Sequence, residues 1–324
     1  MPQTTVGTDV LKEAVQLACR APSIHNSQPW RWIAGTSTLE LHLDASRLVR
    51  SDSSSRQALI SCGAVLDHLQ VAMAAAGWTS FVDRYPNPND HRHLASIDFA
   101  PKEYVTEGHH RRAQAIGRRR TDRLPFAAPK NPDAVEAALR QAVADAALLD
   151  VLGDDARPAL VEAAAGTEAA RLYDSAYHAE LDWWTSSLDP TTGIPHSALI
   201  SAAERDRVAL GRRFPVTHHQ EQRREVPQDR SLIVVLSAYD DTRQDVLRCG
   251  EALSAALLTA TMDGLATCTL THLTETPAGS DVVSSLTGRA LPELLIRVGT
   301  APADEDAPPP TPRRPLAEVL TVNR

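Results

Sequence analysis

Apolar and polar residues follow one another with two different periods along the chain, and these periods predict helices and strands. Residues 10–20 place apolar side chains three and four positions apart, which predicts a helix that Pro22 ends. Residues 38–43 alternate strictly, and together with residues 30–34 they predict a β-hairpin. Asn131 is followed by a proline and then by apolar residues at helical spacing, which predicts the start of another helix.

Two later segments, residues 231–237 and 294–299, are almost continuously apolar. Such runs are typical of strands that are covered on both faces, so we expect a sheet flanked by helices. Residues 166–230 show no comparable strand pattern, and we interpret them as an insertion. Residues 301–315 contain six prolines, so we expect this tail to run extended over the surface without joining the core.

An alanine-rich helical pattern occurs twice, each time at the dipeptide Cys-Gly, at residues 62–63 and 249–250. The two stretches end at Gly77 and Gly264, and each is followed by a strand-like run of β-branched or aromatic residues. This similarity has two interpretations. Either the chain contains two copies of one folding unit, or two buried helices share their composition by chance.

The composition excludes several classes of protein. With 324 residues, 43% apolar and 23% charged, the chain is neither disordered nor fibrous, and it is long enough for two domains. Its net charge of −8 disfavours nucleic acid as a partner. The four cysteines lie far apart in sequence, and no basic and apolar leader is visible. We therefore expect a cytoplasmic protein without a membrane partner.

Several catalytic motifs are absent from the sequence. It contains no G-x-S-x-G elbow, no phosphate-binding P-loop and no G-x-G-x-x-G dinucleotide fingerprint. The paired histidines lie in polar stretches and lack the spacing of a zinc site, so we expect no metal. The function must therefore depend on a different kind of site.

Two segments combine residues that suit ligand binding. Residues 20–30 read Arg-Ala-Pro-Ser-Ile-His-Asn-Ser-Gln-Pro-Trp. Two prolines fix this loop of amides and hydroxyls, which either holds a flat heteroaromatic ring or only satisfies its own turn. Residues 118–123 contain four arginines that repel one another. This run either binds a phosphate or forms a solvated charged surface.

Together the two segments resemble the FMN-binding motifs of the nitroreductase family. Members of that family carry an Arg-Arg-Ser-x-Arg type cluster, then Pro-Ser-x-x-Asn-x-Gln-Pro-Trp, and finally a basic pair after a strand that ends in glycine. Residues 22–30 match the second motif at every fixed position, and Arg313 and Arg314 match the basic pair after Gly299. The resemblance covers the whole chain except the insertion.

The order of the motifs differs from the usual one, because the Pro-Ser loop precedes the arginine cluster at residues 118–123. Each half of the chain keeps the motif that the other half lacks, as in the tandem Acg branch of the family. The resemblance implies an α+β nitroreductase-like fold in which two fused halves, residues 1–112 and 113–324, form an intramolecular pseudo-dimer. The second half would include the insertion at about 166–230, as a candidate lid, and the extended tail 301–324.

The resemblance also implies which residues contact FMN. Arg119 and Thr121 would meet the phosphate, with Arg120 lending main chain or charge. Arg123 lies where the family places a cation near the pyrimidine edge of the flavin, and there it would stabilise negative charge on the reduced ring. The other implied contacts are Pro22, Ser23, Ile24, Asn26, Gln28, Leu270, Thr271, His272, Arg313 and Arg314.

The implied activity is that of an FMN-dependent oxidoreductase. NAD(P)H would give a hydride to FMN, and a quinone or nitroaromatic small molecule would then take the electrons. No side chain needs to act as a nucleophile or general acid, although Arg123 is a candidate charge stabiliser. Because a single chain can build one complete site, we expect one FMN per chain and a monomer.

Two other hypotheses are compatible with parts of the sequence. The protein either turns FMN over or sequesters it, since Trp183 or Trp184 stacked on the flavin would block the nicotinamide. Alternatively, both tryptophans only pack a helix against the body of the protein. A module that uses the arginine cluster alone to bind an anion or nucleic acid is disfavoured by the net charge.

Overall fold

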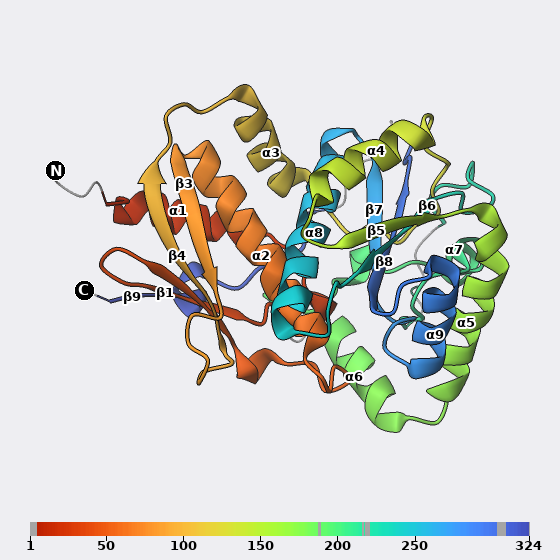
Figure 1. Ribbon diagram of the computed structural model, residues 1–324. Coiled ribbons are helices and arrows are strands. Elements are labelled where there is room, and N and C mark those ends of the chain that lie inside the picture. Colours follow the sequence, from red (N-terminus) through yellow and green to blue (C-terminus); the bar gives the residue numbers. More distant parts are fainter. Residues whose placement is uncertain (1–4, 187–188, 216, 218–220, 303–308, 324) are drawn as a thin grey trace.

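Two sheets lie on opposite sides of the molecule, with the long helices α2 (Arg56–Ala75) and α8 (Arg243–Met262) between them, in the computed structural model (Figure 1). The first sheet has the strand order β3-β4-β2-β1-β9, and the second has the order β5-β6-β8-β7. Both chain ends lie on the side of the first sheet (Figure 1). The structure describes residues 5–186, 189–215, 217, 221–302 and 309–323.

The first sheet has one face packed on helices. Its strands are Trp30–Ala34 (β1), Leu39–Leu43 (β2), Trp78–Arg84 (β3), His93–Pro101 (β4) and Leu320–Val322 (β9). β1 and β2 form the predicted hairpin, in which Trp30 pairs with Leu43. Neighbouring strands are antiparallel except for β1 and β9, which are parallel. Alternate residues of β1 and β2 are buried in one core with α2 and with α1 (Thr8–Ala18), the helix predicted for residues 10–20.

The second sheet is covered on both faces. Its strands are Leu148–Leu152 (β5), Leu232–Ser237 (β6), Ala266–Leu270 (β7) and Pro292–Gly299 (β8), and all neighbours are antiparallel. The two predicted apolar runs form its central strands, β6 and β8. Apolar residues of α4 (Pro132–Val143) and α8 share one core with one face of these strands, and those of α5 (Arg157–Ala170) and α9 (Pro277–Thr287) share another core with the opposite face. The side chain of Asn131 caps α4, as predicted.

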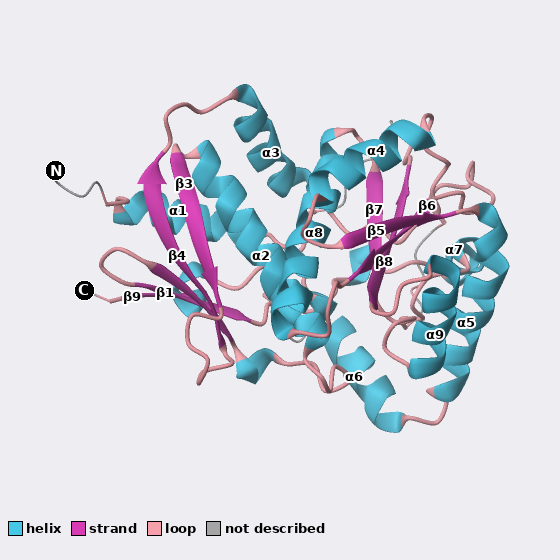
Figure 2. Cartoon of the chain, viewed as in Figure 1, coloured by secondary structure: helices cyan, strands magenta, loops and turns pink. Residues whose placement is uncertain are grey.

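Shorter helices complete the described chain (Figure 2). Most of them lie in the connections near the junction of the two sheets and in the expected insertion. Within its described residues, the insertion at 166–230 contains helices and loops but no strand. These helices are Ile24–Asn26 (η1), Ala45–Arg47 (η2), Glu107–Arg118 (α3), Asp154–Ala156 (η3), Ser175–Thr185 (α6), His196–Ala198 (η4), Ala202–Val208 (α7) and Leu316–Val319 (α10).

The two copies of the repeat meet at their glycines. A Cβ atom at Gly63 would lie 1.9 Å from the carbonyl oxygen of Leu247 and 2.8 Å from the Cα of Gly250, so only glycine permits this approach of α2 to α8. Gly77 and Gly264 end the two helices with positive φ angles of 86° and 74°, and a strand follows each of them. α2 is apolar and long enough to cross a membrane, but 78% of its apolar window is buried inside the protein.

The C-terminal tail continues past residues 301–315, the stretch expected to stay outside the core. Its last described residues form α10 and β9, and Val319 and Leu320 are buried in the core of the first sheet. β1 would otherwise present an edge of unpaired backbone groups, and β9 pairs with that edge. The end of the predicted second half, residues 113–324, therefore lies on the sheet of the first half. The expected boundary at residues 112–113 falls within α3.

Candidate functional site

A cavity of about 750 Å³ lies where segments far apart in the sequence converge. The loop after α1 meets the segment after α3, the end of β7, the insertion and the tail at this place. Among the predicted cofactor contacts, Gln28 and Arg314 are outside the lining. The others line the cavity: Pro22, Ser23, Ile24, Asn26, Arg119, Arg120, Thr121, Arg123, Leu270, Thr271, His272 and Arg313.

One end of the cavity carries three neighbouring arginines, Arg20, Arg119 and Arg313, which we call the basic pole. Arg313 donates hydrogen bonds to the carbonyl oxygens of Cys19, Arg20 and Ala21 at 2.9–3.1 Å, where α1 ends. Arg119 donates to the carbonyl oxygen of Arg20 at 3.3 Å, and its Nε is buried without a hydrogen-bond partner. Among the residues that the structure describes, no carboxylate forms an ion pair with any of the three.

The electrostatics of the basic pole favour a bound anion. Burial, and then the charge of Arg20, lower the pKa of Arg119 to about 10. Burial and the charges of Arg119 and Arg20 also lower the pKa of Arg313 well below its ordinary value. Both directions mean that the charged forms are held in an unfavourable environment. An anion at this end would supply the missing negative charge.

The Pro-Ser loop has a strained backbone. His25, Asn26 and Gln28 have φ angles of 47°, 57° and 52°, which non-glycine residues rarely adopt, at a cost on the order of 1–3 kcal/mol each. The hydroxyl of Ser23 accepts a hydrogen bond from the amide of Gln28 at 3.0 Å, and Ser61 accepts one from Ile24 at 3.1 Å. These bonds hold the loop against the cavity. The side-chain oxygen of Asn26 is buried and has no partner within the described residues.

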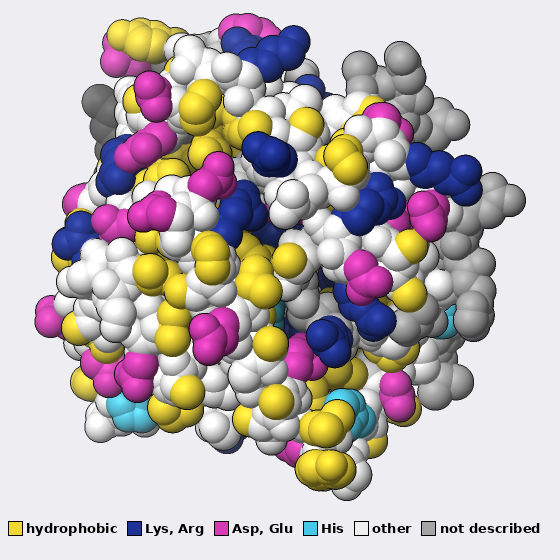
Figure 3. Space-filling model, turned by 90° about the vertical axis from the view of Figure 1, so that its right-hand side faces the viewer, with side chains coloured by type: hydrophobic (Ala, Val, Ile, Leu, Met, Phe, Trp, Pro, Cys, Tyr) yellow, Lys and Arg dark blue, Asp and Glu magenta, His cyan; other side chains and the backbone are white. Residues whose placement is uncertain are grey.

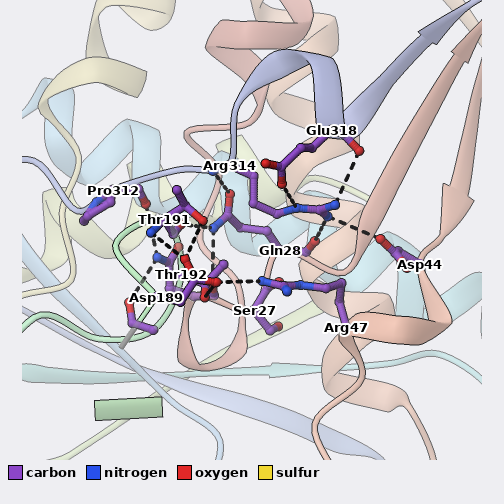
Figure 4. Close-up of polar contacts among 12 residues, drawn as sticks. Ser27, Gln28, Asp44, Arg47, Asp189, Thr191, Thr192, Pro312, Arg314 and Glu318 are labelled. Atoms are coloured by element: carbon purple, nitrogen blue, oxygen red, sulfur yellow. Dashed lines mark hydrogen bonds and ion pairs between the residues drawn. The ribbon is translucent and has the colours of Figure 1, made fainter. Parts of the chain in front are cut away.

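Gln28 and Arg314 connect the loop to other segments instead of lining the cavity (Figure 4). The buried amide of Gln28 donates to the carbonyl oxygen of Thr191 at 2.9 Å and accepts from the backbone amide of Arg314 at 2.9 Å. The guanidinium of Arg314 reaches Asp44 at 3.3 Å. These bonds use polar atoms of Gln28, whose side chain bridges loop, insertion and tail from outside the cavity lining.

The opposite end of the cavity, which we call the ring end, consists of Arg123, Phe214, His25 and His272. Arg123 donates to the carbonyl oxygen of Ala198 at 3.1 Å, and its guanidinium carbon lies 5.1 Å from the centre of the Phe214 ring. The ring of His25 meets Phe214 edge-on at 5.9 Å. Burial and the charge of Arg212 lower the pKa of His25 and of His272 to about 3, so both rings are neutral at pH 7.

These neutral imidazoles have unused hydrogen-bonding capacity. The Nε2 of His25 and both ring nitrogens of His272 are buried without partners in the described part of the chain. A neutral imidazole offers one donor and one acceptor. His25 lies inside the predicted motif but is absent from the predicted contacts. The left-handed backbone that turns it toward the cavity has no signature in the sequence.

An acidic residue compensates the arginines behind the ring end. Glu275 forms ion pairs with Arg212 and with Arg171, the latter at 2.9 Å. Burial alone would raise the pKa of Glu275, but these two arginines lower it to about 2. The hydroxyl of Thr271 donates to Gln57 at 2.9 Å. Sequence reasoning missed this cluster because its members come from separate segments and share no motif.

The two tryptophans of the insertion do not line the cavity. Trp183 is 59% exposed, whereas Trp184 is buried and its ring lies 6.4 Å from that of His25. A Cβ atom at Gly193 would lie 2.6 Å from the carbonyl oxygen of Trp184, so this part of the insertion is closely packed. The packing interpretation accounts for Trp184. The aromatic residue that the insertion contributes to the cavity is Phe214.

No family model matches the chain, but curated proteins of Mycobacterium tuberculosis are similar over almost its whole length. A protein of strain ATCC 25618 / H37Rv named "Putative NAD(P)H nitroreductase acg" is 60% identical over 325 residues, which cover 99% of this chain and 98% of that protein. A second protein of that strain, "Putative NAD(P)H nitroreductase Rv3131", is 36% identical, with 96% of this chain and 91% of that protein covered.

Similar solved structures are more distant. The FMN and NADPH-dependent nitroreductase NfnB from sphigopyxis sp. strain HMH is 17% identical, with a TM-score of 0.43, and the match covers 65% of this chain and 97% of that one. NfnB from Mycobacterium smegmatis in complex with NADPH is 15% identical, with a TM-score of 0.41, 67% of this chain and 100% of that one. The assignment therefore depends on the full-length relatives. By that likeness, the chain belongs to the nitroreductase family, in the branch that includes Acg.

Proposed function

We propose that the chain binds one FMN in the cavity and uses NAD(P)H to reduce quinone or nitroaromatic small molecules. One observation carries this proposal: a buried basic pole without an acidic partner among the described residues shares a cavity with a rigid loop of unsatisfied polar groups. A ligand with an anionic end and a flat polar ring would satisfy both ends, and FMN has this form. The names of the full-length relatives support the same electron donor and reaction class.

The basic pole would hold the FMN phosphate. The free Nε of Arg119 is available to an anion, and Arg313 is fixed beside it by its bonds to the end of α1. Thr121 is held by an isolated backbone bridge to Thr267, so its main chain is also in a defined place. A hydrogen bond between a buried guanidinium and a phosphate contributes about 1.5–3 kcal/mol.

The ring end would orient the flavin. FMN, when bound, supplies the ring that accepts a hydride and passes electrons on. Arg123 would hold positive charge beside the ring, and the unpaired nitrogens of His25 and His272 would donate to or accept from its polar edge. The residues of this chain therefore act by binding, orienting and stabilising charge, and none is required as a nucleophile.

The two-half architecture supports a single site in a monomer. We propose that residues 1–112 and 113–324 are nitroreductase-like halves that form an intramolecular pseudo-dimer. In support, α2 and α8 are equivalent in length and meet at Gly63 and Gly250. The first half supplies Arg20 and the loop at residues 22–26, and the second supplies Arg119, Arg123 and Arg313, so one chain contributes both ends of the cavity.

A location in the cytoplasm is part of the proposal. Cys19, Cys62, Cys249 and Cys268 are all buried free thiols. Reduced thiols are the expected state in a reducing compartment.

FMN sequestration is the second candidate function, and one observation favours it. Residues 193–195, residues 197–200 and Phe214 of the insertion line the cavity, and the side chain of Asn26 in the loop donates to the carbonyl oxygen of Gly193 at 3.0 Å. An insertion attached in this way acts as a lid over the ring end. It would slow the approach of the nicotinamide while tightening FMN binding.

An anaerobic visible spectrum of the FMN-loaded protein distinguishes the two candidates. Reduction of the flavin band by NADPH or NADH at a rate near that with dithionite supports the oxidoreductase. Reduction by dithionite alone supports sequestration. Failure to bind one equivalent of FMN contradicts both functions, and two equivalents per chain contradict the single-site architecture. Retention on heparin without FMN binding would instead support the anion-binding module.

A further inference from the structure

The cavity has more positive charge than one phosphate can balance. Ten arginines and a single acidic residue, Asp122, line it within the described chain. Three of these arginines, Arg212, Arg223 and Arg297, form ion pairs with carboxylates. The other seven form none with a described residue, although the protein as a whole has a net charge of −8. A phosphate monoester carries a charge of about −1.5 to −2, so a surplus remains after FMN has bound.

Part of the surplus comes from arginines that belong to neither the basic pole nor the ring end as defined above. Arg118 is exposed at the end of α3, and Arg120 is half-buried two residues later. Arg205 is half-buried in α7, within the insertion. All three line the cavity, and no side-chain hydrogen bond or ion pair to a described residue engages any of them. On the face that Figure 3 shows, Lys and Arg side chains gather around a hollow.

We propose that Arg120 and Arg205, assisted by Arg118, form an anion subsite that receives a second ligand with a phosphate or carboxylate group. This inference rests on the proposed function, because FMN would occupy the basic pole. The half-buried position of Arg120 and Arg205 makes their attraction for an anion stronger than that of open surface arginines. Arg120 belongs to the segment after α3 and Arg205 to the insertion, and both line the same cavity, so an anion bound by both would join the two segments.

Two sources could supply this anion, and they differ in their place in the reaction. The electron donor carries phosphates, including the 2′-phosphate that distinguishes NADPH from NADH. The acceptor is the other source, if its natural form is a carboxylate- or phosphate-bearing quinone or aromatic. In either case the site selects charge in the second ligand, whereas a neutral nitroaromatic would leave Arg120 and Arg205 without a counter-charge.

Binding to the oxidised, FMN-saturated protein tests the subsite without turnover. Two probe pairs that differ in charge are titrated by calorimetry: NADP⁺ against NAD⁺, and 4-nitrobenzoate against 4-nitrobenzamide. In the double variant Arg120→Gln/Arg205→Gln, the affinity for the more anionic member of at least one pair is expected to fall tenfold or more. The affinity for the other member of that pair should fall less than twofold. The NADP⁺ pair assigns the subsite to the donor, and the nitrobenzoate pair assigns it to the acceptor.

Arg111→Gln is the control for the loss of one of the two charges, because Arg111 is exposed on α3 and lies outside the cavity. Thermal stability should be unchanged in both variants, and every titration is made at an FMN concentration that saturates the variant used. If the affinities for both members of each pair fall equally, or if Arg111→Gln causes the same loss of affinity, the proposed subsite is wrong. Failure of the wild-type protein to bind FMN instead overturns the proposed function from which the subsite follows.

Discussion

The two ends of the cavity treat buried charge in different ways. At the basic pole, Arg20, Arg119 and Arg313 have no acidic partner in the described chain, and the pKa of Arg119 falls to about 10 through burial and the charge of Arg20. Behind the ring end, the side chains of Arg171 and Arg212 are only 14% and 7% exposed, but they share Glu275. The arginines of the basic pole therefore repel one another, and a bound anion would reduce this repulsion. Behind the ring end, Glu275 already balances the positive charge, so this end can accept a neutral ring.

Removing Glu275 should make the ring end resemble the basic pole. Glu275→Gln leaves Arg171 and Arg212 buried without their carboxylate, and breaking a buried ion pair in this way costs about 3–5 kcal/mol. We expect the free energy of unfolding in urea to fall by that amount. Glu318→Gln is the control, because Glu318 is exposed and its pair with Arg314 is 3.5 Å long. A similar small change in both variants would show that Glu275 does not compensate buried charge.

The same kind of change at the basic pole should have the opposite effect on stability. Arg119→Gln removes a buried charge that lacks an acidic partner, so the FMN-free protein should be as stable as the wild type or more stable. FMN affinity should nevertheless fall roughly ten- to a hundredfold, since a charged hydrogen bond to phosphate contributes about 1.5–3 kcal/mol. Fluorescence titration of FMN and urea unfolding of the FMN-free protein measure the two effects.

Arg111→Gln again serves as the control, because this exposed residue lies on the same helix, α3, outside the cavity. Arg111→Gln should change neither the affinity for FMN nor the free energy of unfolding of the FMN-free protein. If Arg119→Gln destabilises the FMN-free protein by several kcal/mol, the basic pole is a structural element of the fold, and the contrast between the two ends is lost.

Acid pH should reveal that the two histidines of the ring end are buried in their neutral form. Burial lowers the pKa of His25 and His272 to about 3, below the ordinary value of 6.5, so the unfolded chain binds protons that the folded one does not. Their contribution to stability is complete above about pH 6.5 and is lost as the pH falls toward 3. Each histidine contributes a slope of up to about 1.4 kcal/mol per pH unit.

His272→Gln should reduce this slope between pH 6 and 5, measured by urea unfolding at both values, by that amount. Arg111→Gln, an exposed change on α3 outside the cavity, should leave the slope unchanged. The contribution of Glu275 to the free energy of unfolding is lost only at lower pH, because its pKa is lowered to about 2 from an ordinary value of 4.5. An unchanged slope in His272→Gln would mean that its ring is not buried in a neutral form.

Local patterns in the sequence predicted much of the fold, and most of the residues predicted from the family motifs line the cavity. The hairpin of β1 and β2, the cap at Asn131 and the central strands β6 and β8 follow from spacing, because the forces that form them act between near neighbours. The partnership of Glu275 with Arg171 and Arg212 depends on tertiary contacts, so no local pattern could reveal it. The return of the tail to β1 depends on a free sheet edge in the same way.

The role of Gln28 shows the limit of a motif. The motif identifies Gln28 correctly as part of the loop, but the amide is occupied by Thr191 of the insertion and Arg314 of the tail (Figure 4). The insertion and the tail lie outside the motif, so the motif carries no information about these two partners of Gln28. A fixed position in a motif can thus support a site from outside the cavity, and only the three-dimensional arrangement distinguishes support from contact.

The smallest expected effect concerns Phe214, which covers the ring end and has no counterpart among the residues of the basic pole. Phe214→Leu keeps the apolar character but removes the contacts of the aromatic ring with His25 and the Arg123 guanidinium. Such contacts contribute about 0.5–1.5 kcal/mol, so FMN affinity should fall roughly two- to tenfold. If the insertion shields the flavin, the rate of its reduction by NADPH should rise at the same time.

Stopped-flow reduction under anaerobic conditions measures that rate, and Trp183→Leu is the matched control, since Trp183 is an exposed aromatic of the same insertion outside the cavity. A faster reduction in Phe214→Leu alone would place the barrier to the nicotinamide at the ring end, and it would favour the sequestering function of the wild-type protein. A weaker FMN affinity with an unchanged rate would restrict Phe214 to cofactor binding. The ring end would then be open to the nicotinamide, as the oxidoreductase function requires.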